Sequence, residues 1–265
     1  MTTDLRTIPV WQGQIHMRVR SKGSGPALVF FHGSWGLTWD PFLDALAESF
    51  TVHAPEHPGT TPGAPDEVHR LDGLWDLVLC YDELLQALGV ESATFVGHSF
   101  GGMVASEVAA AYPGRARRLV LIAPLGFWRD ADPIVNWMVL DLPQLRARIF
   151  RDPDGEPARR MFGATDDPKA AAQARIRLMW AMGSTGKFIW PIPDKGLKKR
   201  IHRIAQIPTL LVWGEDDRLV PRVYAEEFAR RLAHARTELI ENAGHAPHLE
   251  QPETVGRMVR EFLGQ

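Results

Sequence analysis

Ser99 stands in the sequence Gly-His-Ser-Phe-Gly at residues 97–101. The flanking glycines permit a tight turn in which the serine adopts strained backbone angles and presents its hydroxyl group. An apolar run over 93–96 precedes this motif, and a helical pattern over 103–112 follows it. A serine at such a strand-to-helix turn is typical of a nucleophile beside the positive end of a helix. We therefore predict Ser99 as a catalytic nucleophile, with an incidental serine in a glycine-rich turn as the alternative.

Acidic residues and a histidine follow Ser99 later in the chain. Residues 214–217 read Gly-Glu-Asp-Asp after the predicted strand 209–213, and His245 follows a further predicted strand at 237–240. Because parallel strands end at one edge of a sheet, these groups should meet there. A histidine can remove the serine proton during attack, and a carboxylate can orient that histidine. The order of the three groups predicts acyl transfer with His245 as general base.

The segments between these motifs alternate between strand and helix. An alternating pattern over 14–20 indicates a half-buried strand, and the segment 74–88 repeats apolar residues at helical spacing. A continuous apolar run, which is typical of a strand buried on both faces, occurs at 27–31, and further strands are predicted at 50–54, 93–96, 119–123 and 209–213. The predicted fold class is α/β, with a mostly parallel central sheet and helices on both faces.

Residues 125–205 interrupt this alternation, because they contain no buried-strand pattern and many aromatic residues and methionines. We interpret them as a helical lid inserted between the two parts of the core domain, residues 1–124 and 206–265. Apolar lid residues either form the lid's own core or make a wall of the substrate pocket. The candidate substrate-binding residues are Trp35, Phe127, Trp128, Trp137 and Met138.

The composition excludes several classes of function. The 265 residues are 45% hydrophobic and 23% charged, so the chain can bury a core. Its formal net charge is -2, so it has no overall electrostatic field that would attract nucleic acid or a membrane surface. No apolar stretch reaches the length of a membrane helix. Cys80 is the single cysteine, which excludes an intrachain disulfide and is compatible with a reducing cytoplasm. We expect a cytoplasmic protein with a small-molecule partner.

Two further patterns receive structural interpretations. His53, Glu56 and His57 have the His-x-x-Glu-His spacing of some zinc sites, but Pro55 and Pro58 forbid the helix that this spacing requires. No metal and no cofactor are therefore predicted. The basic run 195–203 is interpreted as a solvated face of the last lid helix.

With these motifs the chain resembles the α/β-hydrolase superfamily, and in particular its small lidded carboxylesterases and meta-cleavage product hydrolases. Residues 32–36, His-Gly-Ser-Trp-Gly, are similar to the family's oxyanion loop, and residues 56–59, Glu-His-Pro-Gly, to the loop usually written Asp-x-Pro-Gly. The resemblance implies the α/β-hydrolase fold and Asp217, rather than the neighbouring Asp216, as the catalytic acid. It also implies an oxyanion hole formed by the backbone amides of Phe100 and Ser34, with Trp35 as the alternative to Ser34. His32 and His98 are expected to hold loops by hydrogen bonds.

The predicted function is a cofactor-independent serine hydrolase that cleaves carboxylic esters of small apolar substrates through an acyl-enzyme (EC 3.1.1). Ser99 argues against the relatives that use a carboxylate nucleophile, the haloalkane dehalogenases and epoxide hydrolases. Ala246 stands where resembling hydroxynitrile lyases carry Lys and many meta-cleavage hydrolases carry Trp, which argues against both of these specialised reactions. The alternatives are a lactone, amide or carbon–carbon bond hydrolase with the same triad, and a small-molecule receptor of this fold. The sequence leaves open whether the protein is a homodimer.

Overall fold

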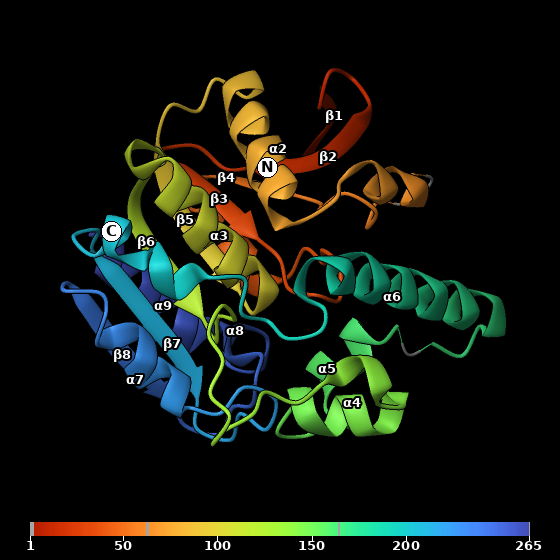
Figure 1. The fold of residues 1–265 in the computed structure, drawn as a ribbon. Coiled ribbons are helices and arrows are strands. Elements are labelled where there is room, and N and C mark those ends of the chain that lie inside the picture. The colour runs from red at the N-terminus through yellow and green to blue at the C-terminus, as the bar shows by residue number, and fades with distance from the viewer. Residues whose placement is uncertain (1–2, 62–63, 164, 265) are drawn as a thin grey trace.

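The computed structural model describes residues 3–61, 64–163 and 165–264. Its centre is an eight-stranded sheet in the order β1-β2-β4-β3-β5-β6-β7-β8 (Figure 1). β2 runs opposite to the other strands of the sheet, which all point the same way, so the predicted mostly parallel sheet is confirmed. The strands are β1 (Asp4–Val10), β2 (Ile15–Lys22), β3 (Ala27–Phe31), β4 (Thr51–Pro55), β5 (Ala93–His98), β6 (Ala116–Ile122), β7 (Thr209–Gly214) and β8 (Ala235–Ile240).

Helices cover both faces of this sheet. In β3, Val29 and Phe31 join the apolar core on one face of the sheet, while Leu28 and Phe30 join the core on the other face. This alternation follows from the pleat of a strand that is buried on both sides. The helices of the core are α1 (Pro41–Ala47), α2 (Leu74–Ala87), α3 (Phe100–Ala111), α7 (Val223–Ala229), α8 (Pro247–Glu250) and α9 (Pro252–Leu263), with 3-10 turns η1 (Pro65–Arg70) and η2 (Pro113–Arg115).

Between β6 and β7, the described residues form helices and no strand. The longest, α6, has 22 residues and extends away from the sheet at the right of Figure 1. The division of the chain into 1–124, 125–205 and 206–265 stays a prediction. The elements of this segment are η3 (Trp137–Val139), α4 (Leu142–Ile149), α5 (Glu156–Met161), α6 (Pro168–Ile189), η4 (Leu197–Lys199) and η5 (Ile201–Ile204).

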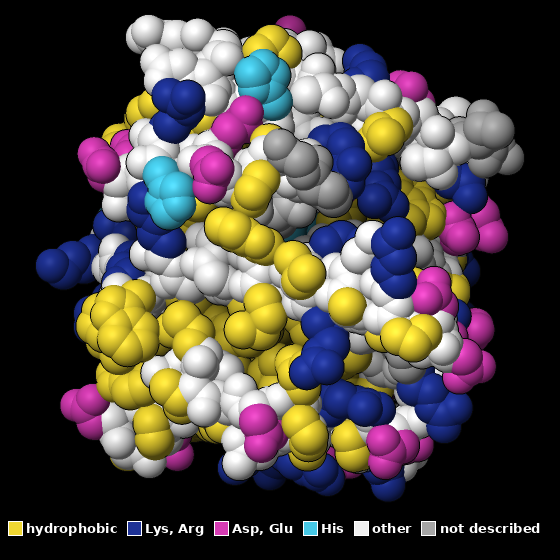
Figure 2. All heavy atoms as spheres, turned by 90° about the vertical axis from the view of Figure 1, so that its right-hand side faces the viewer, with side chains coloured by type: hydrophobic (Ala, Val, Ile, Leu, Met, Phe, Trp, Pro, Cys, Tyr) yellow, Lys and Arg dark blue, Asp and Glu magenta, His cyan; other side chains and the backbone are white. Residues whose placement is uncertain are grey.

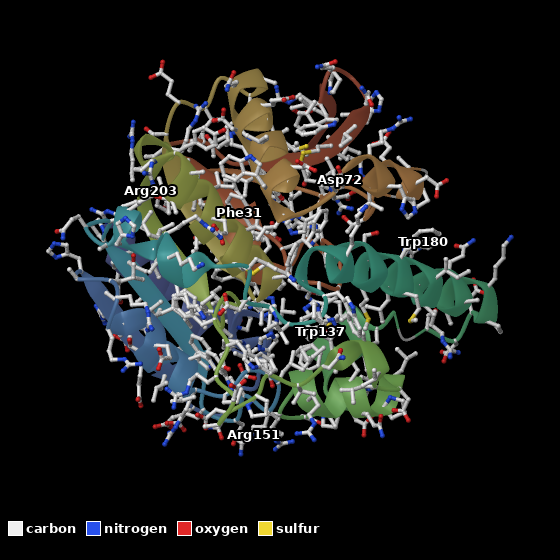
Figure 3. All side chains as sticks on the ribbon, in the orientation of Figure 1. Phe31, Asp72, Trp137, Arg151, Trp180 and Arg203 are labelled. Atoms are coloured by element: carbon white, nitrogen blue, oxygen red, sulfur yellow. The ribbon has the colours of Figure 1, made fainter. Side chains whose placement is uncertain are left out.

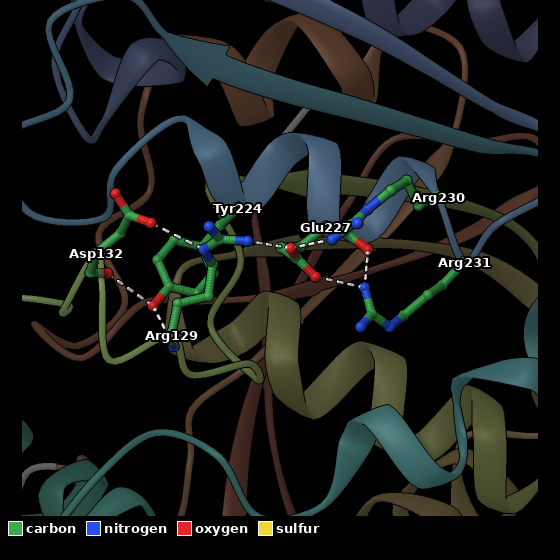
Figure 4. Close-up of polar contacts among 6 residues, drawn as sticks. All are labelled: Arg129, Asp132, Tyr224, Glu227, Arg230 and Arg231. Carbon is green, nitrogen blue, oxygen red and sulfur yellow. Dashed lines mark hydrogen bonds and ion pairs between the residues drawn. The ribbon is translucent and has the colours of Figure 1, made fainter.

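A network of polar contacts ties the chain after β6 to α7 (Figure 4). Arg129 donates to Glu227 at 2.6 Å and to Asp132 at 2.9 Å. The Tyr224 hydroxyl accepts from the Arg129 amide and donates to the Asp132 carbonyl, both at 2.9 Å. Arg231 also pairs with Glu227, at 2.6 Å. The start of the segment 125–205 is therefore fixed to the core.

The end of that segment is anchored as well, which corrects our interpretation of the basic run 195–203. Arg200 makes two hydrogen bonds to the buried carboxylate of Glu107 on α3, at 2.7 and 2.6 Å. Arg203 donates to the Ala110 carbonyl on the same helix. The run forms short 3-10 turns against α3 and is not the solvated face of one helix.

Candidate active site

Ser99 is the single residue between the end of β5 and the start of α3. Its φ of 55° and ψ of -117° place a non-glycine residue in a strained region of the backbone map. Hydrogen bonds hold it there, because its amide donates to Ile122 at 2.9 Å and its carbonyl accepts from Leu125 at 3.0 Å. A Cβ at Gly101 would lie 2.0 Å from the Phe31 carbonyl oxygen, so the turn requires glycine at that position.

Ser99, His245 and Asp217 form a continuous hydrogen-bonded chain. His245 Nε2 lies 2.8 Å from Ser99 Oγ, and His245 Nδ1 lies 2.8 Å from Asp217 Oδ2. The other oxygen of Asp217 accepts the amides of Leu219 and Val220 at 2.9 and 2.8 Å, which fixes the plane of the carboxylate. This arrangement can keep a proton on Nδ1 and leave Nε2 free to accept the serine proton.

The neighbouring carboxylate, Asp216, lies elsewhere. It is half-exposed and pairs with Arg151 at 3.3 Å. The side chains of Ser99, Asp217 and His245, in contrast, are each 0% exposed. Three residues that the sequence placed in separate loops are thus brought together in one buried site.

The backbone of His245 is held on both sides. Its amide donates to the Ile149 carbonyl at the end of α4 at 2.7 Å. Its carbonyl accepts from His98 Nε2 at 2.9 Å, which confirms the expectation that His98 holds a loop. The segment 125–205 therefore contacts the loop that carries the candidate general base.

Glu250 was missed by the sequence reasoning. Its two oxygens accept the Gly244 amide at 2.7 Å and the Arg151 amide at 2.9 Å, so it joins the loop before His245 to the loop after α4. Burial raises the pKa of Glu250, opposed by these two amides. Its position five residues after His245, on the short helix α8, was the only signal in the sequence.

A chain of hydrogen bonds supports the loop 32–36. The Tyr81 hydroxyl lies 2.6 Å from His57 Nδ1, which leaves His57 Nε2 to donate to the His32 carbonyl at 2.9 Å. His32 Nε2 accepts the His57 amide at 3.0 Å, and His32 Nδ1 donates to the Gly33 carbonyl at 2.7 Å. The expected loop-holding role of His32 is thereby confirmed. This series of hydrogen bonds ends at the Gly33 carbonyl, one residue before Ser34.

The two predicted oxyanion donors are amides of buried residues, Phe100 and Ser34. Phe100 is the first residue of α3, so its amide belongs to the first turn, where helical N–H groups have no intrahelical acceptor. Ser34 is 0% exposed, and its Oγ has no hydrogen-bond partner within the described residues. Its carbonyl accepts from Thr185 on α6 at 3.3 Å.

The other buried histidines near the site are held neutral. Burial lowers the pKa of His57 to about 4 and that of His248 to about 3. Burial likewise lowers the pKa of His32 and His98 well below the ordinary value. These rings therefore add no positive charge beside His245 near neutral pH.

Two of the predicted substrate-binding aromatic residues lie at the site. The Trp35 ring is 6.0 Å from the His245 ring and 6.1 Å from the Trp137 ring. Trp137 lies between α4 and α6 (Figure 3). Met138 is next to α6, where its Sδ would be 2.8 Å from a Cβ placed on Gly186.

Phe127 and Trp128 make their contacts elsewhere. Phe127 packs on Phe228 of α7, with ring centroids 4.4 Å apart, and lies under the Arg231 guanidinium. Trp128 donates its indole N–H to Asp130 at 2.8 Å. None of these contacts brings either ring to the triad. The packing of Phe127 on α7 explains why this side chain is buried and apolar.

A cavity of about 230 Å³ lies beside this site, between the loop 33–41, α5 and α8. Trp35, His98 and His248 contribute to its wall, together with the buried carboxyl of Asp40. Burial raises the pKa of Asp40 to about 7, although the Leu43 and Phe42 amides oppose this shift. Because the triad side chains are fully buried, a substrate can reach Ser99 from such a cavity only if the surrounding side chains move.

The structure also bears on metals and membranes. In the described ranges, no three His, Cys, Asp or Glu side chains are grouped to hold a metal ion. His53 lies on β4 and contacts Ser21 Oγ at 2.9 Å, while Glu56 pairs with Arg18. Among the helices of the described chain, none combines the length and apolar character needed to cross a lipid bilayer.

The mostly parallel eight-stranded sheet with helices on both faces defines an α/β protein. A model of the Alpha/beta hydrolase family matches residues 28–257, and the chain belongs to this family. The chain is 27% identical over 251 residues to a pimeloyl-[acyl-carrier protein] methyl ester esterase of Nitrosomonas europaea, covering 89% of this chain and 95% of that protein.

Solved structures show the same fold. A 2-hydroxy-6-oxo-6-phenylhexa-2,4-dienoate hydrolase from Rhodococcus sp. strain RHA1 superposes with a TM-score of 0.73 at 21% identity, covering 100% of both chains. A carboxylesterase from Bacillus subtilis superposes with a TM-score of 0.72 at 21% identity, covering 99% of this chain and 92% of that one. The fold of this chain is thus shared with a dienoate hydrolase and with a carboxylesterase.

Proposed function

We propose that the protein is a serine hydrolase that cleaves carboxylic esters of small substrates through an acyl-enzyme intermediate. The observation that carries this proposal is the buried chain of two 2.8 Å contacts from Ser99 through His245 to Asp217, on a strained turn at the start of α3. No cofactor takes part in the proposed reaction.

In the proposed mechanism, Ser99 Oγ attacks the ester carbonyl carbon while His245 Nε2 takes its proton. Asp217 stabilises the imidazolium that forms. The oxyanion accepts hydrogen bonds from the amides of Phe100 and Ser34, each of which contributes about 3 kcal/mol to the lowering of the barrier. The imidazolium protonates the leaving alcohol. Water then attacks the acyl-enzyme, His245 takes its proton, and the acid leaves with Ser99 restored.

The segment 125–205 acts in this proposal as a lid, and Trp35, Trp137 and Met138 contact the apolar part of the substrate. The burial of Trp137 and its contact with Trp35 support this role. The reaction needs neither nucleic acid nor a membrane surface, and a cytoplasmic location remains part of the proposal.

The test is hydrolysis of a graded series of p-nitrophenyl acyl esters, with Ser99→Ala as the control and a serine-directed phosphonate as a probe. We expect turnover that rises and falls with chain length, is abolished by Ser99→Ala, and is blocked by labelling of Ser99. Folded protein without turnover would overturn the esterase proposal. A hydrolase for a lactone, amide or carbon–carbon bond substrate, or a small-molecule receptor, would then be the better explanation of the fold and site.

A further inference from the structure

Four arginines converge on a second cavity, of about 180 Å³, on the face of the molecule that carries α5 and α6. Arg18 and Arg20 come from β2, Arg160 from α5 and Arg177 from α6. Figure 2 shows several Lys and Arg side chains around the apolar recess on the face that lies at the right of Figure 1. The cavity is thus assembled from elements far apart in the sequence.

The acidic groups at this cavity do not balance the arginines. Glu56 is the carboxylate in its wall, and it is 3% exposed. Arg18 satisfies it with two hydrogen bonds, at 2.6 and 3.0 Å, while Arg20 approaches it only to 3.5 Å. Arg160 pairs with Glu156 in an exposed contact between neighbouring turns of α5.

Two guanidinium groups therefore remain available. Arg20 is 31% exposed and has only the long contact to Glu56. Arg177 is exposed on α6, and none of the ion pairs among the described residues includes it. A guanidinium presents a planar set of donors that matches a carboxylate or phosphate group, and in a concave site it is less screened than on open surface.

The cavity lies next to the candidate active site. Trp35 and Gly36 contribute to its wall, and the Trp35 ring is 6.0 Å from the His245 ring. Trp35 and Arg160 also line the 230 Å³ cavity described above. Trp35 therefore borders both His245 and the cavity that holds the arginines.

We propose that this cavity binds a carboxylate or phosphate group of the substrate, so that the protein prefers esters with an anionic group at the end of the chain away from the ester bond. The inference rests on the proposed ester hydrolysis and adds the substrate class to it. Arg20 and Arg177 are the residues that bind the anion, and Arg18 chiefly neutralises Glu56.

The experiment compares monomethyl esters of dicarboxylic acids, over a series of chain lengths, with methyl esters of the same length that end in a primary amide. For each protein the readout is the ratio of kcat/KM for the acid to that for the amide, which cancels general losses of activity. We expect a ratio of about tenfold for the wild type at the best chain length, falling as salt rises from about 0.02 M to about 0.5 M. Methyl esters of the same chain lengths that end in a phosphate group show whether the cavity prefers phosphate or carboxylate.

Arg177→Gln and Arg20→Gln should each lower this ratio at least about threefold. Arg175→Gln is the matched control, because Arg175 is exposed on the same helix but is not part of the cavity wall. Hydrolysis of both series at equal rates, with dependence on Ser99, would overturn this inference and leave the ester hydrolase standing.

Binding to Ser99→Ala protein separates the two proposals further. The dissociation constants of the acid and the amide ester are measured by calorimetry, so no turnover is needed. Tighter binding of the acid, weakened by Arg177→Gln but not by Arg175→Gln, supports the anion site even if the wild type hydrolyses no ester. Equal binding of the two compounds overturns it.

Discussion

Asp217 is constrained more tightly than a carboxylate that only accepts one bond from histidine. Two backbone amides on one oxygen leave the other oxygen to His245. In Asp217→Asn, the amide oxygen should keep these two bonds and turn its NH₂ group toward His245 Nδ1. The imidazole would then carry its proton on Nε2 and could not accept the proton of Ser99.

We therefore expect Asp217→Asn to lower kcat by about 10⁴-fold with little change in the free energy of unfolding. Ester hydrolysis and urea denaturation of the same preparation measure the two quantities. A loss of activity below about tenfold would show that Asp217 does not control the tautomer of His245.

Asp40 gives a prediction about pH. Its side chain caps α1 by accepting the Leu43 amide at 3.0 Å, yet burial raises its pKa from 3.8 to about 7. A raised folded-state pKa means that the folded protein binds the proton more tightly than the unfolded chain. The contribution of Asp40 to stability is therefore full below about pH 4 and is lost as the pH rises through about 7.

Asp40→Asn keeps the helix cap and removes the charge. The variant should gain stability relative to the wild type between about pH 5 and about pH 8, by at most about 4 kcal/mol. Urea denaturation across this range measures the difference. A difference that does not change with pH would contradict a titrating Asp40.

At the scale of elements, the junction of β5 and α3 depends on glycine. Gly101→Ala would place a Cβ 2.0 Å from the Phe31 carbonyl oxygen, which belongs to the backbone of β3 and cannot rotate away. We expect a loss of about 3 kcal/mol or more in the free energy of unfolding, together with loss of activity, because α3 must shift from the sheet.

Gly114→Ala is the matched control for this substitution. Gly114 lies at the far end of α3, in η2, and a Cβ there would meet no atom within 4 Å. Its effect on stability should stay within about 1 kcal/mol. Thermal denaturation of both variants decides the matter, and equal effects of the two would refute the argument from close packing.

The sequence predicted these elements well where a strand is buried on both faces. Apolar runs mark such strands in the sequence. β3 accordingly has its expected ends, and β7 extends only one residue further than expected. β8 begins at Ala235, two residues before its predicted start, because its first residues are partly exposed and show no apolar run. Composition alone cannot mark such an edge strand.

The candidate site was predictable in part. Ser99 and His245 could be found because a glycine turn and a strand end mark them locally. The resemblance selected Asp217, which now contacts His245. Trp137 and Phe127 have the same apolar character, and only the tertiary structure places one beside Trp35 and the other on α7. Glu250 likewise acts on backbone amides from two loops, which no local pattern reveals.

At the scale of the whole molecule, the segment 125–205 contacts the loop that carries His245, through the Ile149 carbonyl. Its first part is tied to α7 through Arg129, and its last part to α3 through Arg200. Between these anchors, α6 makes weaker hydroxyl contacts with core loops, from Ser184 to the Gly59 carbonyl at 3.1 Å and from Thr185 to the Ser34 carbonyl at 3.3 Å. Because α4 is held to the His245 loop through Ile149 at 2.7 Å, α6 is the part of the segment best able to move.

Because the side chain of Ser99 is 0% exposed, we expect α6 to move before any reagent reaches it. The observed rate of labelling by a serine-directed phosphonate should then reach a plateau as its concentration rises, and the plateau should equal the rate of opening. Stopped-flow fluorescence with a labelled phosphonate measures this rate.

Ser184→Ala removes one contact that holds α6 closed, so the plateau should rise about fivefold, corresponding to about 1 kcal/mol for a hydroxyl hydrogen bond. Thr51→Val removes a similar hydroxyl-to-carbonyl bond, to Gly25 at 3.0 Å, where β4 begins and away from the sheet edge that carries the triad, and should leave the plateau unchanged. A labelling rate that stays proportional to concentration in all three proteins would mean that the site is open in solution. The 0% exposure of Ser99 would then describe a minor closed state, and access to Ser99 would not depend on α6.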